Sequence, residues 1–209
     1  MMKILSFPYG LVQANMYVLV FGDDAIVIDP CVPWKRTGLP DMNIRAVLCT
    51  HGHFDHISEV DGYSSSSIYI SKEDREMLSD PDLNHSTDFG LNIRYEGDAC
   101  VFEKTAYTNE DFGISERFSL EIISVPGHTS GSVCLLFKGE EGMGHMFTGD
   151  MLFAGSVGRT DLGGSESDMM RSIRLLSEMP GDILCYPGHG EDTDLAREKQ
   201  FNPYFRFFK

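Results

Sequence analysis

The chain has 209 residues, of which 42% are hydrophobic, and this is enough to bury one sizeable core. Its 32 acidic residues against 17 basic residues give a formal net charge of −15, without a long block of like charge. Nucleic acids and acidic membrane surfaces bind clustered lysine and arginine, so this composition argues against both as partners. We predict one domain that spans residues 1–209.

Cysteine usage and the start of the chain predict a cytoplasmic protein. The five cysteines are single, and no two form a C-x-x-C pair. Several lie in apolar runs, such as AVLCT around Cys49 and SVCLLF around Cys134, which is typical of buried thiols in a reducing compartment. Pro8 interrupts the apolar start MMKILSFPYGLV and no cleavage site follows, so we interpret it as a first strand, not a signal peptide.

Strands and a few helices alternate along the chain. Apolar runs predict strands at residues 15–21, 25–30, 44–50, 67–70, 120–126, 132–137, 145–149 and 182–187. Helical spacing predicts helices near 72–79, at 166–179 with Ser165 or Ser167 as N-cap, and at 192–200 with Asp192 or Thr193 as N-cap. The mixed charges of SKEDRE, residues 71–76, indicate a solvated helix face. Two sheets with helices on both sides, an α/β sandwich, accommodate this order of elements.

Residues 80–117 have mixed charge, several glycines and no clean period. A segment of this length without regular structure is uncommon in a compact domain, and such segments often carry function. We therefore predict an irregular insertion near the functional site.

One short stretch, THGHFDH, crowds four metal-ligand side chains into six positions: His51, His53, Asp55 and His56. Glycine separates the first two, and the chain runs into this stretch from a buried strand. An extended segment points residues two apart to the same side, so His51 and His53 face one position. The chain then turns and offers Asp55 and His56 to a neighbouring position.

Three further motifs place a histidine or aspartate next to glycine after an apolar strand. His128 lies in PGHTSG, Asp150 in FTGD and His189 in PGHG. Loops at strand ends can converge, and glycine permits tight turns there. Imidazole and carboxylate suit Zn²⁺, Fe or Mn²⁺, and this number of donors predicts two ions, with Asp150 able to bridge them. His85 and His145 match no motif, and we interpret both as ordinary structural histidines.

These motifs, in this order, closely resemble the metallo-β-lactamase superfamily. The spacing agrees as well: 75 residues from His53 to His128, 22 to Asp150 and 39 to His189. The resemblance implies an αββα sandwich of two mixed sheets. It also implies that His51, His53 and His128 bind one metal ion, that Asp55, His56 and His189 bind the other, and that Asp150 bridges the two.

Within the superfamily, the chain looks most like the glyoxalase II group, in its short bacterial form without a C-terminal helical domain. This resemblance implies hydrolysis of a small thioester, such as S-lactoylglutathione, by a hydroxide between two divalent ions. Zinc is the first expectation, with iron or manganese as alternatives, and Asp55 would also orient the hydroxide. The loop after Asp150, MLFAGSVGRTDLGGSES, lacks the lysine and tyrosine that hold the substrate in the classical enzyme.

The GRTD sequence at residues 158–161 supports an alternative. Persulfide dioxygenases of the same superfamily carry it, and the resemblance would then imply one iron bound by His51, His128 and Asp150. Arg159 and Asp161 could instead form a loop ion pair, or Arg159 could orient a metal ligand from outside. A non-catalytic scaffold is a third hypothesis, although all seven ligands are present. The aromatic tail FNPYFRFF could close the core or form a homodimer contact.

Overall fold

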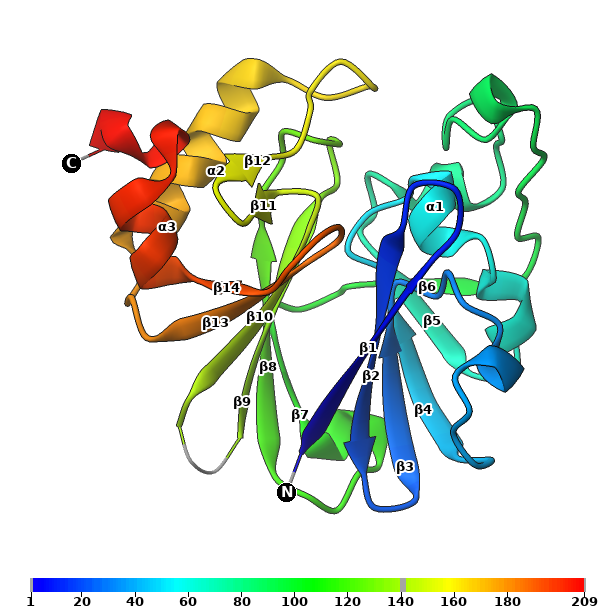
Figure 1. Ribbon diagram of the computed structural model, residues 1–209. Helices are drawn as coiled ribbons and strands as arrows, with labels where there is room; N and C mark the ends of the chain where they lie inside the picture. The colour runs from blue at the N-terminus through cyan, green and yellow to red at the C-terminus, as the bar shows by residue number, and fades with distance from the viewer. Residues whose placement is uncertain (1, 140–141, 209) are drawn as a thin grey trace.

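The computed structural model describes residues 2–139 and 142–208, and two six-stranded sheets face each other in it (Figure 1). The first sheet has the order β1 (Lys3–Tyr9), β2 (Ala14–Phe21), β3 (Asp24–Ile28), β4 (Asn43–Leu48), β5 (Ser67–Ile70) and β6 (Ala99–Val101). The second has the order β14 (Thr193–Asp194), β13 (Ile183–Pro187), β10 (Gly144–Gly149), β9 (Val133–Gly139), β8 (Phe118–Ser124) and β7 (Ala106–Thr108). A separate ribbon pairs β11 (Leu152–Phe153) with β12 (Ser156–Val157).

Both six-stranded sheets are mixed, as the αββα prediction requires. In the first, β1, β2 and β3 are antiparallel, whereas β3 to β6 run parallel. In the second, β10 and β13 are parallel and the remaining pairs are antiparallel. The predicted sandwich is therefore confirmed.

The core between the sheets follows from the two-residue period of the strands. Leu19 and Ile26 point into the layer between the sheets, while their neighbours Val18 and Val27 point to the outer face of the first sheet. Both faces of these strands are buried, which explains why their sequences are continuous apolar runs rather than alternating ones. From the second sheet, Phe137 enters the same layer and contacts the ring of Phe147.

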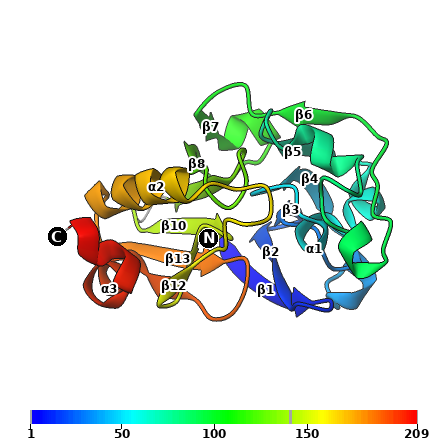
Figure 2. The ribbon, with the colours of Figure 1, turned by 90° about the horizontal axis from the view of Figure 1, so that it is seen from above.

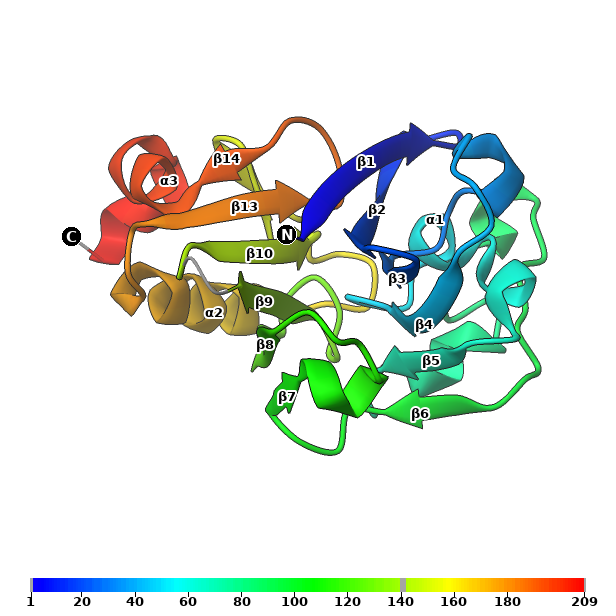
Figure 3. The same cartoon turned by 90° about the horizontal axis from the view of Figure 1, so that it is seen from below.

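The outer face of the second sheet is covered by α2 (Glu166–Glu178), α3 (Leu195–Phe201) and the 3-10 helix η6 (Pro203–Phe208) (Figures 2 and 3). Ser165 caps α2, because its side chain accepts a hydrogen bond from the backbone N–H of Asp168. Phe205 of the aromatic tail is buried in this layer, whereas Phe207 is exposed. The outer face of the first sheet has a thinner cover: α1 (Phe54–Ile57) and the 3-10 helices η1 (Trp34–Arg36) and η2 (Val60–Tyr63).

Three sequence predictions of secondary structure were wrong. Residues 80–117 are not irregular throughout, because they contain η4 (Thr87–Phe89), β6, β7 and η5 (Asn109–Phe112), and β6 and β7 extend one edge of each sheet. The helix expected near 72–79 is only the 3-10 turn η3 (Arg75–Leu78). The last helix starts three residues late, at Leu195, because Asp194 rather than Asp192 or Thr193 caps it. Tertiary pairing overrides weak local propensity in segments this short.

Among the helices of residues 2–139 and 142–208, none has both the length and the apolar character needed to cross a membrane.

We expect Phe137→Ala to lower the free energy of unfolding by about 3–5 kcal/mol, because it empties part of the fully buried layer between the sheets. Urea denaturation of the metal-loaded protein measures this loss. The matched control is Leu184→Ala on β13, whose residue is 37% exposed and whose truncation should cost less than about 1 kcal/mol. Equal losses in the two variants would contradict the assigned layers.

We further expect one reactive thiol per native chain and five after denaturation. Cys100 is exposed, whereas the other four cysteines are buried. Burial also raises the pKa of Cys31 and of Cys185 to about 12, which keeps these two thiols protonated. Titration with a thiol reagent at neutral pH gives the count, and Cys100→Ser should reduce the native value to zero. Any fast thiol in that variant would contradict the burial of the others.

Candidate metal centre

The predicted ligands follow strands that end at the same edge of the sandwich. His51 follows β4, His128 follows β8, Asp150 follows β10 and His189 follows β13. The strands β8 and β10 run in one direction because both are antiparallel to β9, and β13 is parallel to β10. Loops at the carboxyl ends of parallel strands are where α/β proteins commonly bind ligands.

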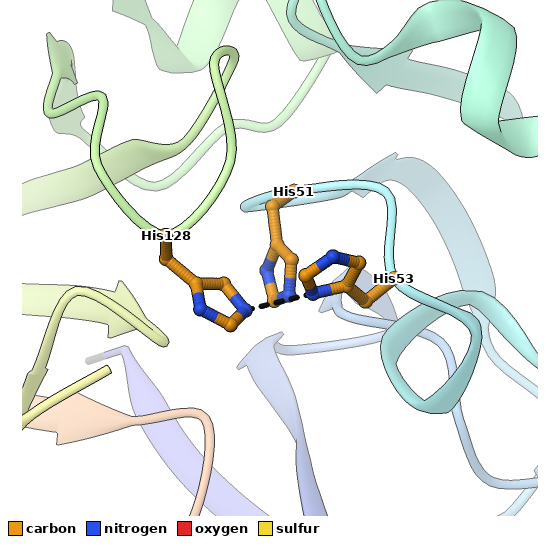
Figure 4. Close-up of side chains that lie close together, drawn as sticks. All are labelled: His51, His53 and His128. Atoms are coloured by element: carbon orange, nitrogen blue, oxygen red, sulfur yellow. Dashed lines mark hydrogen bonds between the residues drawn. The ribbon is translucent and has the colours of Figure 1, made fainter. Parts of the chain in front are cut away.

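His51, His53 and His128 form a first group, in which one ring nitrogen of each lies within 4.8 Å of the others. Figure 4 shows the three rings converging from the loop before α1 and from the loop after β8. His53 Nδ1 lies 2.7 Å from His128 Nε2, and all three residues are buried.

Asp55, His56 and His189 form a second group with the same 4.8 Å spacing of ligand atoms. His189 Nε2 lies 3.2 Å from Asp55 Oδ2, and His56 Nε2 lies 3.6 Å from the same oxygen. Asp55 and His56 belong to α1, so a single short helix turns the chain from the first group to the second.

The carboxylate of Asp150 lies between the two groups. Its Oδ2 is 3.5 Å from His128 Nε2 of the first group and 3.5 Å from His189 Nε2 of the second. Its Oδ1 is 3.3 Å from His56 Nε2. The structure thus brings all seven residues singled out in the sequence into one cluster.

Two buried atoms in this cluster test whether its residues fit a cation. Among the described residues, His51 Nε2 and Asp150 Oδ1 are the buried side-chain nitrogen or oxygen atoms without a hydrogen-bond partner. A buried polar atom without a partner costs about 1–3 kcal/mol, and native structures rarely leave one unexplained. A divalent ion would accept lone pairs from both atoms, and the set of imidazoles and carboxylates suits Zn²⁺, Fe or Mn²⁺. The residues therefore fit a metal centre.

Hydrogen bonds on the outer side of each ring aim one lone pair of every histidine into the cluster. In four of them Nδ1 is engaged and Nε2 faces inward: His51, His56, His128 and His189. Their Nδ1 partners are, in that order, Thr50 Oγ1 at 3.1 Å, Asp29 Oδ2 at 3.0 Å, the Arg159 carbonyl at 2.7 Å and the Val12 carbonyl at 3.1 Å. In His53 the roles are reversed, because Nε2 donates to the Leu162 carbonyl at 3.3 Å and Nδ1 faces inward. Such outer hydrogen bonds select the tautomer that a metal ion needs.

The two groups differ in their affinity for protons. Burial and the neighbouring histidines lower the pKa of His51 well below its usual value, and burial with His128 lowers that of His53 to about 3. These two rings are neutral and can bind a cation without losing a proton.

In the second group the carboxylates reverse this effect. Burial alone would lower the pKa of His56, but Asp55 and Asp150 raise it well above its usual value. Burial alone would also lower the pKa of His189, but hydrogen bonds to Asp150 and Asp55 outweigh burial and raise this pKa to about 9. A metal ion at the second group must therefore displace protons at neutral pH, whereas His51 and His53 bind one without this cost.

Two buried aspartates that the sequence analysis passed over hold the ligand loops. Asp29 accepts hydrogen bonds from His56 Nδ1 and, at 2.7 Å each, from the Thr50 N–H and hydroxyl. The available signal was its place at the end of a strand, in AIVIDP, which is the pattern shared by the ligands themselves. Its backbone is left-handed, with φ of 51°.

Asp74 is fully buried and connects the two loops of the first group. It accepts from the Gly52 N–H between His51 and His53, and from Thr129 Oγ1 and the Gly131 N–H beside His128. A Cβ atom at Gly131 would lie 2.5 Å from Asp74 Oδ1, which explains why the second glycine of PGHTSG is required. The prediction of a solvated helix face at residues 71–76 was therefore wrong at Asp74, and nothing in the local pattern distinguished this residue.

The PGHG turn packs directly against the cluster. A Cβ atom at Gly188 would lie 2.2 Å from Asp150 Oδ1 and 2.6 Å from the His56 ring, so only glycine fits. Asn15 at the start of β2 holds the turn from the other sheet, because its amide donates to the carbonyls of Pro187 at 3.0 Å and Gly190 at 3.1 Å. His189 is thereby placed against residues of the first sheet.

A cavity of about 610 Å³ opens beside the cluster. Its walls combine five apolar side chains with eight ionisable ones, among them a single arginine; the lining residues are Val12, His53, Phe54, Asp55, His85, Asp88, Phe89, His128, Asp150, Phe153, Arg159, Leu162 and His189. His85, which matched no sequence motif, is part of this wall, and its ring lies 5.3 Å from that of His53. His145 lies outside the wall and interacts with Tyr186.

Arg159 and Asp161 form the loop ion pair, with both side chains exposed and two contacts of 2.6 Å. The guanidinium of Arg159 does not orient a ligand. Its backbone carbonyl does so instead, by accepting the hydrogen bond from His128 Nδ1. Side-chain chemistry could not have predicted a contact made by the main chain.

Comparison with known proteins gives consistent matches along the chain. The family model described as the metallo-beta-lactamase superfamily matches residues 9–189. "Probable metallo-hydrolase YqgX" of Bacillus subtilis is 32% identical, with 99% of each chain covered. Hydroxyacylglutathione hydrolase GloC of Haemophilus influenzae is 32% identical, with 97% of this chain and 98% of the relative covered.

Solved structures agree in fold. The BLEG-1 B3 metallo-beta-lactamase is 30% identical, with a TM-score of 0.81 and coverage of 98% of this chain and 100% of that chain. TTHA1623 in a di-iron-bound form is 29% identical, with a TM-score of 0.79 and coverage of 96% and 99%. The second of these carries two iron ions in the same fold.

We expect Asp29→Asn to weaken metal binding by about 10- to 100-fold, because the carboxylate that orients His56 is lost while asparagine still tolerates the left-handed backbone. Competition with a chromogenic chelator measures the affinity. The matched control is Asp24→Asn at the other end of the same strand, where the carboxylate pairs with Arg45 on the surface. Unchanged metal affinity in Asp29→Asn would contradict the assigned role.

Proposed function

Because the chain belongs to the metallo-β-lactamase superfamily, and its His/Asp cluster is suited to divalent metal, we propose that it hydrolyses small thioesters with two metal ions. One observation carries the proposal: Asp150 lies within 3.5 Å of ligand nitrogens in both groups, as a carboxylate shared by two ions would. The GloC relative supports a thioester as substrate, and S-lactoylglutathione is the first compound to test.

In this proposal His51, His53 and His128 hold one ion, and Asp55, His56 and His189 hold the other. Two bound ions would supply Lewis acidity, which lowers the pKa of a coordinated water to about 7 and polarises an acyl carbonyl. Zinc is the first candidate. Iron must be tested as well, because the similar solved structure of TTHA1623 is in a di-iron-bound form.

The chain's own residues position the reactants. Burial alone would raise the pKa of Asp55, but His56 and His189 outweigh burial and lower this pKa. The carboxylate is therefore ionised and can hold a proton of the attacking water. The apolar walls around Phe54 and Phe153 bind the uncharged parts of the substrate and exclude bulk water. Water adds to the thioester carbonyl, the carbon–sulfur bond breaks, and a carboxylic acid and a thiol leave.

A second candidate is the one-iron persulfide dioxygenase, which the GRTD loop favours. In that case His51, His128 and Asp150 would bind the iron, and the loop would contribute the Arg159 carbonyl that orients His128. A non-catalytic scaffold is disfavoured, because its ligand set would not need to be complete. Metal stoichiometry and the choice of substrate separate the three.

We expect two metal ions per chain by elemental analysis of protein purified without chelator, and hydrolysis of S-lactoylglutathione. His53→Ala and Asp55→Ala should each lower kcat/KM by more than about 100-fold, because each removes a ligand of one ion. His145→Ala, which alters an imidazole outside the pocket, is the matched control and should retain activity. One iron per chain, with near-normal activity in either variant, would overturn the two-metal mechanism and direct assays to oxygen consumption with a persulfide.

A further inference from the structure

A buried carboxylate on α3 joins three segments of the chain. Glu198 is 1% exposed, and its Oε2 accepts hydrogen bonds from the Gly155 N–H at 2.8 Å and from the Asn202 amide at 2.9 Å. Its Oε1 accepts a third from the Thr193 hydroxyl at 2.6 Å. Burying a carboxylate is costly unless donors satisfy its oxygens, and these three groups supply that compensation. The contacts of Glu198 are therefore tied to its burial.

Two of the three segments leave the metal cluster. Gly155 lies in the turn of the β11–β12 ribbon, which begins two residues after Asp150 and lies beside α3 (Figure 2). Thr193 opens β14, four residues after His189. Glu198 thus links the chain that follows Asp150 to the chain that follows His189.

The β11–β12 ribbon presents one residue to the core and the next one to the pocket. Leu152 is fully buried in the layer that α2 and α3 cover, whereas Phe153 lines the cavity beside the cluster. The Phe153 ring lies 6.0 Å from the His189 ring, edge to face. Neighbouring residues of a strand point to opposite faces, so the position of the ribbon sets the position of Phe153 against His189.

The two ends of the ribbon are fixed near the cluster. At its start, Thr148 Oγ1 donates to the Leu152 carbonyl at 2.8 Å. Just beyond its end, the Arg159 carbonyl accepts the hydrogen bond from His128 Nδ1. These contacts hold the ribbon where it leaves and rejoins the site, but they do not reach its turn.

The turn of the ribbon is held from the outside, by α3 and the residue after it. Glu198 accepts from the Gly155 N–H, and the fully buried Asn202 donates to the Ser156 carbonyl at 3.0 Å. The same Asn202 amide also donates to Glu198. Loss of the Glu198 carboxylate therefore frees the Gly155 N–H and leaves Asn202 without its acceptor on α3.

We propose that Glu198 is a positioning residue, which fixes the β11–β12 ribbon so that Phe153 forms the pocket wall beside His189. Its effect on turnover rests on the proposed thioester hydrolysis, whereas its effect on the ribbon rests on the hydrogen bonds alone. Glu198 belongs neither to the metal-binding groups nor to the lining of the cavity. It therefore acts on the substrate through Phe153.

Kinetics of metal-loaded Glu198→Ala on S-lactoylglutathione test the effect on the substrate. We expect KM to rise by about three- to tenfold with kcat within about twofold of the wild type, because a displaced apolar wall weakens ground-state and transition-state binding alike. A role in stability alone would lower the folded fraction, and with it the apparent kcat, at unchanged KM. Unchanged KM in this variant would overturn the inference.

A double-mutant cycle with Phe153→Ala tests the route of the effect. Residues that act through one contact are not additive. If Glu198 acts through the Phe153 ring, Glu198→Ala should change the KM of the Phe153→Ala protein by less than about twofold. Two effects that multiply independently would contradict this route.

A conservative variant and a matched control accompany the cycle. In Glu198→Gln the amide oxygen can still accept from Gly155 and Asn202, and the amide nitrogen can donate to the Thr193 hydroxyl, so KM should return to near the wild-type value. A KM as high as that of Glu198→Ala would contradict the assigned hydrogen bonds. Glu178→Ala removes an exposed glutamate of α2 and should leave KM unchanged.

Hydrogen exchange followed by mass spectrometry gives a readout without substrate. Amides in residues 152–158 should exchange about fivefold faster in Glu198→Ala than in the wild type, and at the wild-type rate in Glu198→Gln and Glu178→Ala. If Glu198→Ala does not fold, Asn202→Ala removes the other contact to the turn and takes its place in both measurements.

The two measurements separate failure of the proposed function from failure of the inference. A wild-type protein that hydrolyses no thioester would reject the proposed function, and the exchange comparison would then decide the inference by itself. Equal exchange of residues 152–158 in the wild type and in Glu198→Ala would refute it.

Discussion

The structure depends on the convergence of imidazole and carboxylate lone pairs at one buried point. Five imidazoles and two carboxylates meet there, and His51 Nε2 and Asp150 Oδ1 are buried without a partner. Without a cation, burying these two atoms costs free energy, because each loses its water and gains no hydrogen bond. The arrangement becomes favourable when a cation enters, so metal affinity and fold stability are coupled in this protein.

The rest of the fold supplies rigid supports for that point. The two sheets bring four strand ends to one edge, and each ring is then fixed by a hydrogen bond on its outer side. Two buried aspartates contribute to this support. Asp29 orients the His56 ring, and Asp74 joins the two loops of the first group. Asn15 connects the sheets at the same edge. Metal ligands are held by such supports as much as by their own strands.

The two metal-binding groups are electrostatically unequal although they share a carboxylate. His51 and His53 are kept neutral by burial and by each other, whereas Asp55 and Asp150 favour protonated His56 and His189. His51 and His53 can therefore bind an ion without releasing a proton, whereas His56 and His189 exchange protons for one.

The sequence by itself determined the fold class and the seven residues of the cluster. Apolar runs of strand length marked the sheets, and histidine and aspartate beside glycine at strand ends marked the ligands, because both signals are local. The edge strands within 80–117 could not be predicted, since three-residue strands are stabilised by the neighbour they pair with and not by their own composition. The tail FNPYFRFF was ambiguous for the same reason, and only packing against the second sheet buried Phe205.

Only the tertiary structure decided which further polar residues belong to the site. Asp74 lies in a stretch of mixed charge and is nevertheless fully buried, because loops from distant parts of the chain close over it. Arg159 contributes its carbonyl rather than its guanidinium, and a backbone contact leaves no trace in side-chain chemistry. His85 matched no motif, and its place in the pocket follows from the buried neighbours that hold its backbone left-handed. Contacts between residues far apart in the chain made these assignments, and a local pattern carries no information about them.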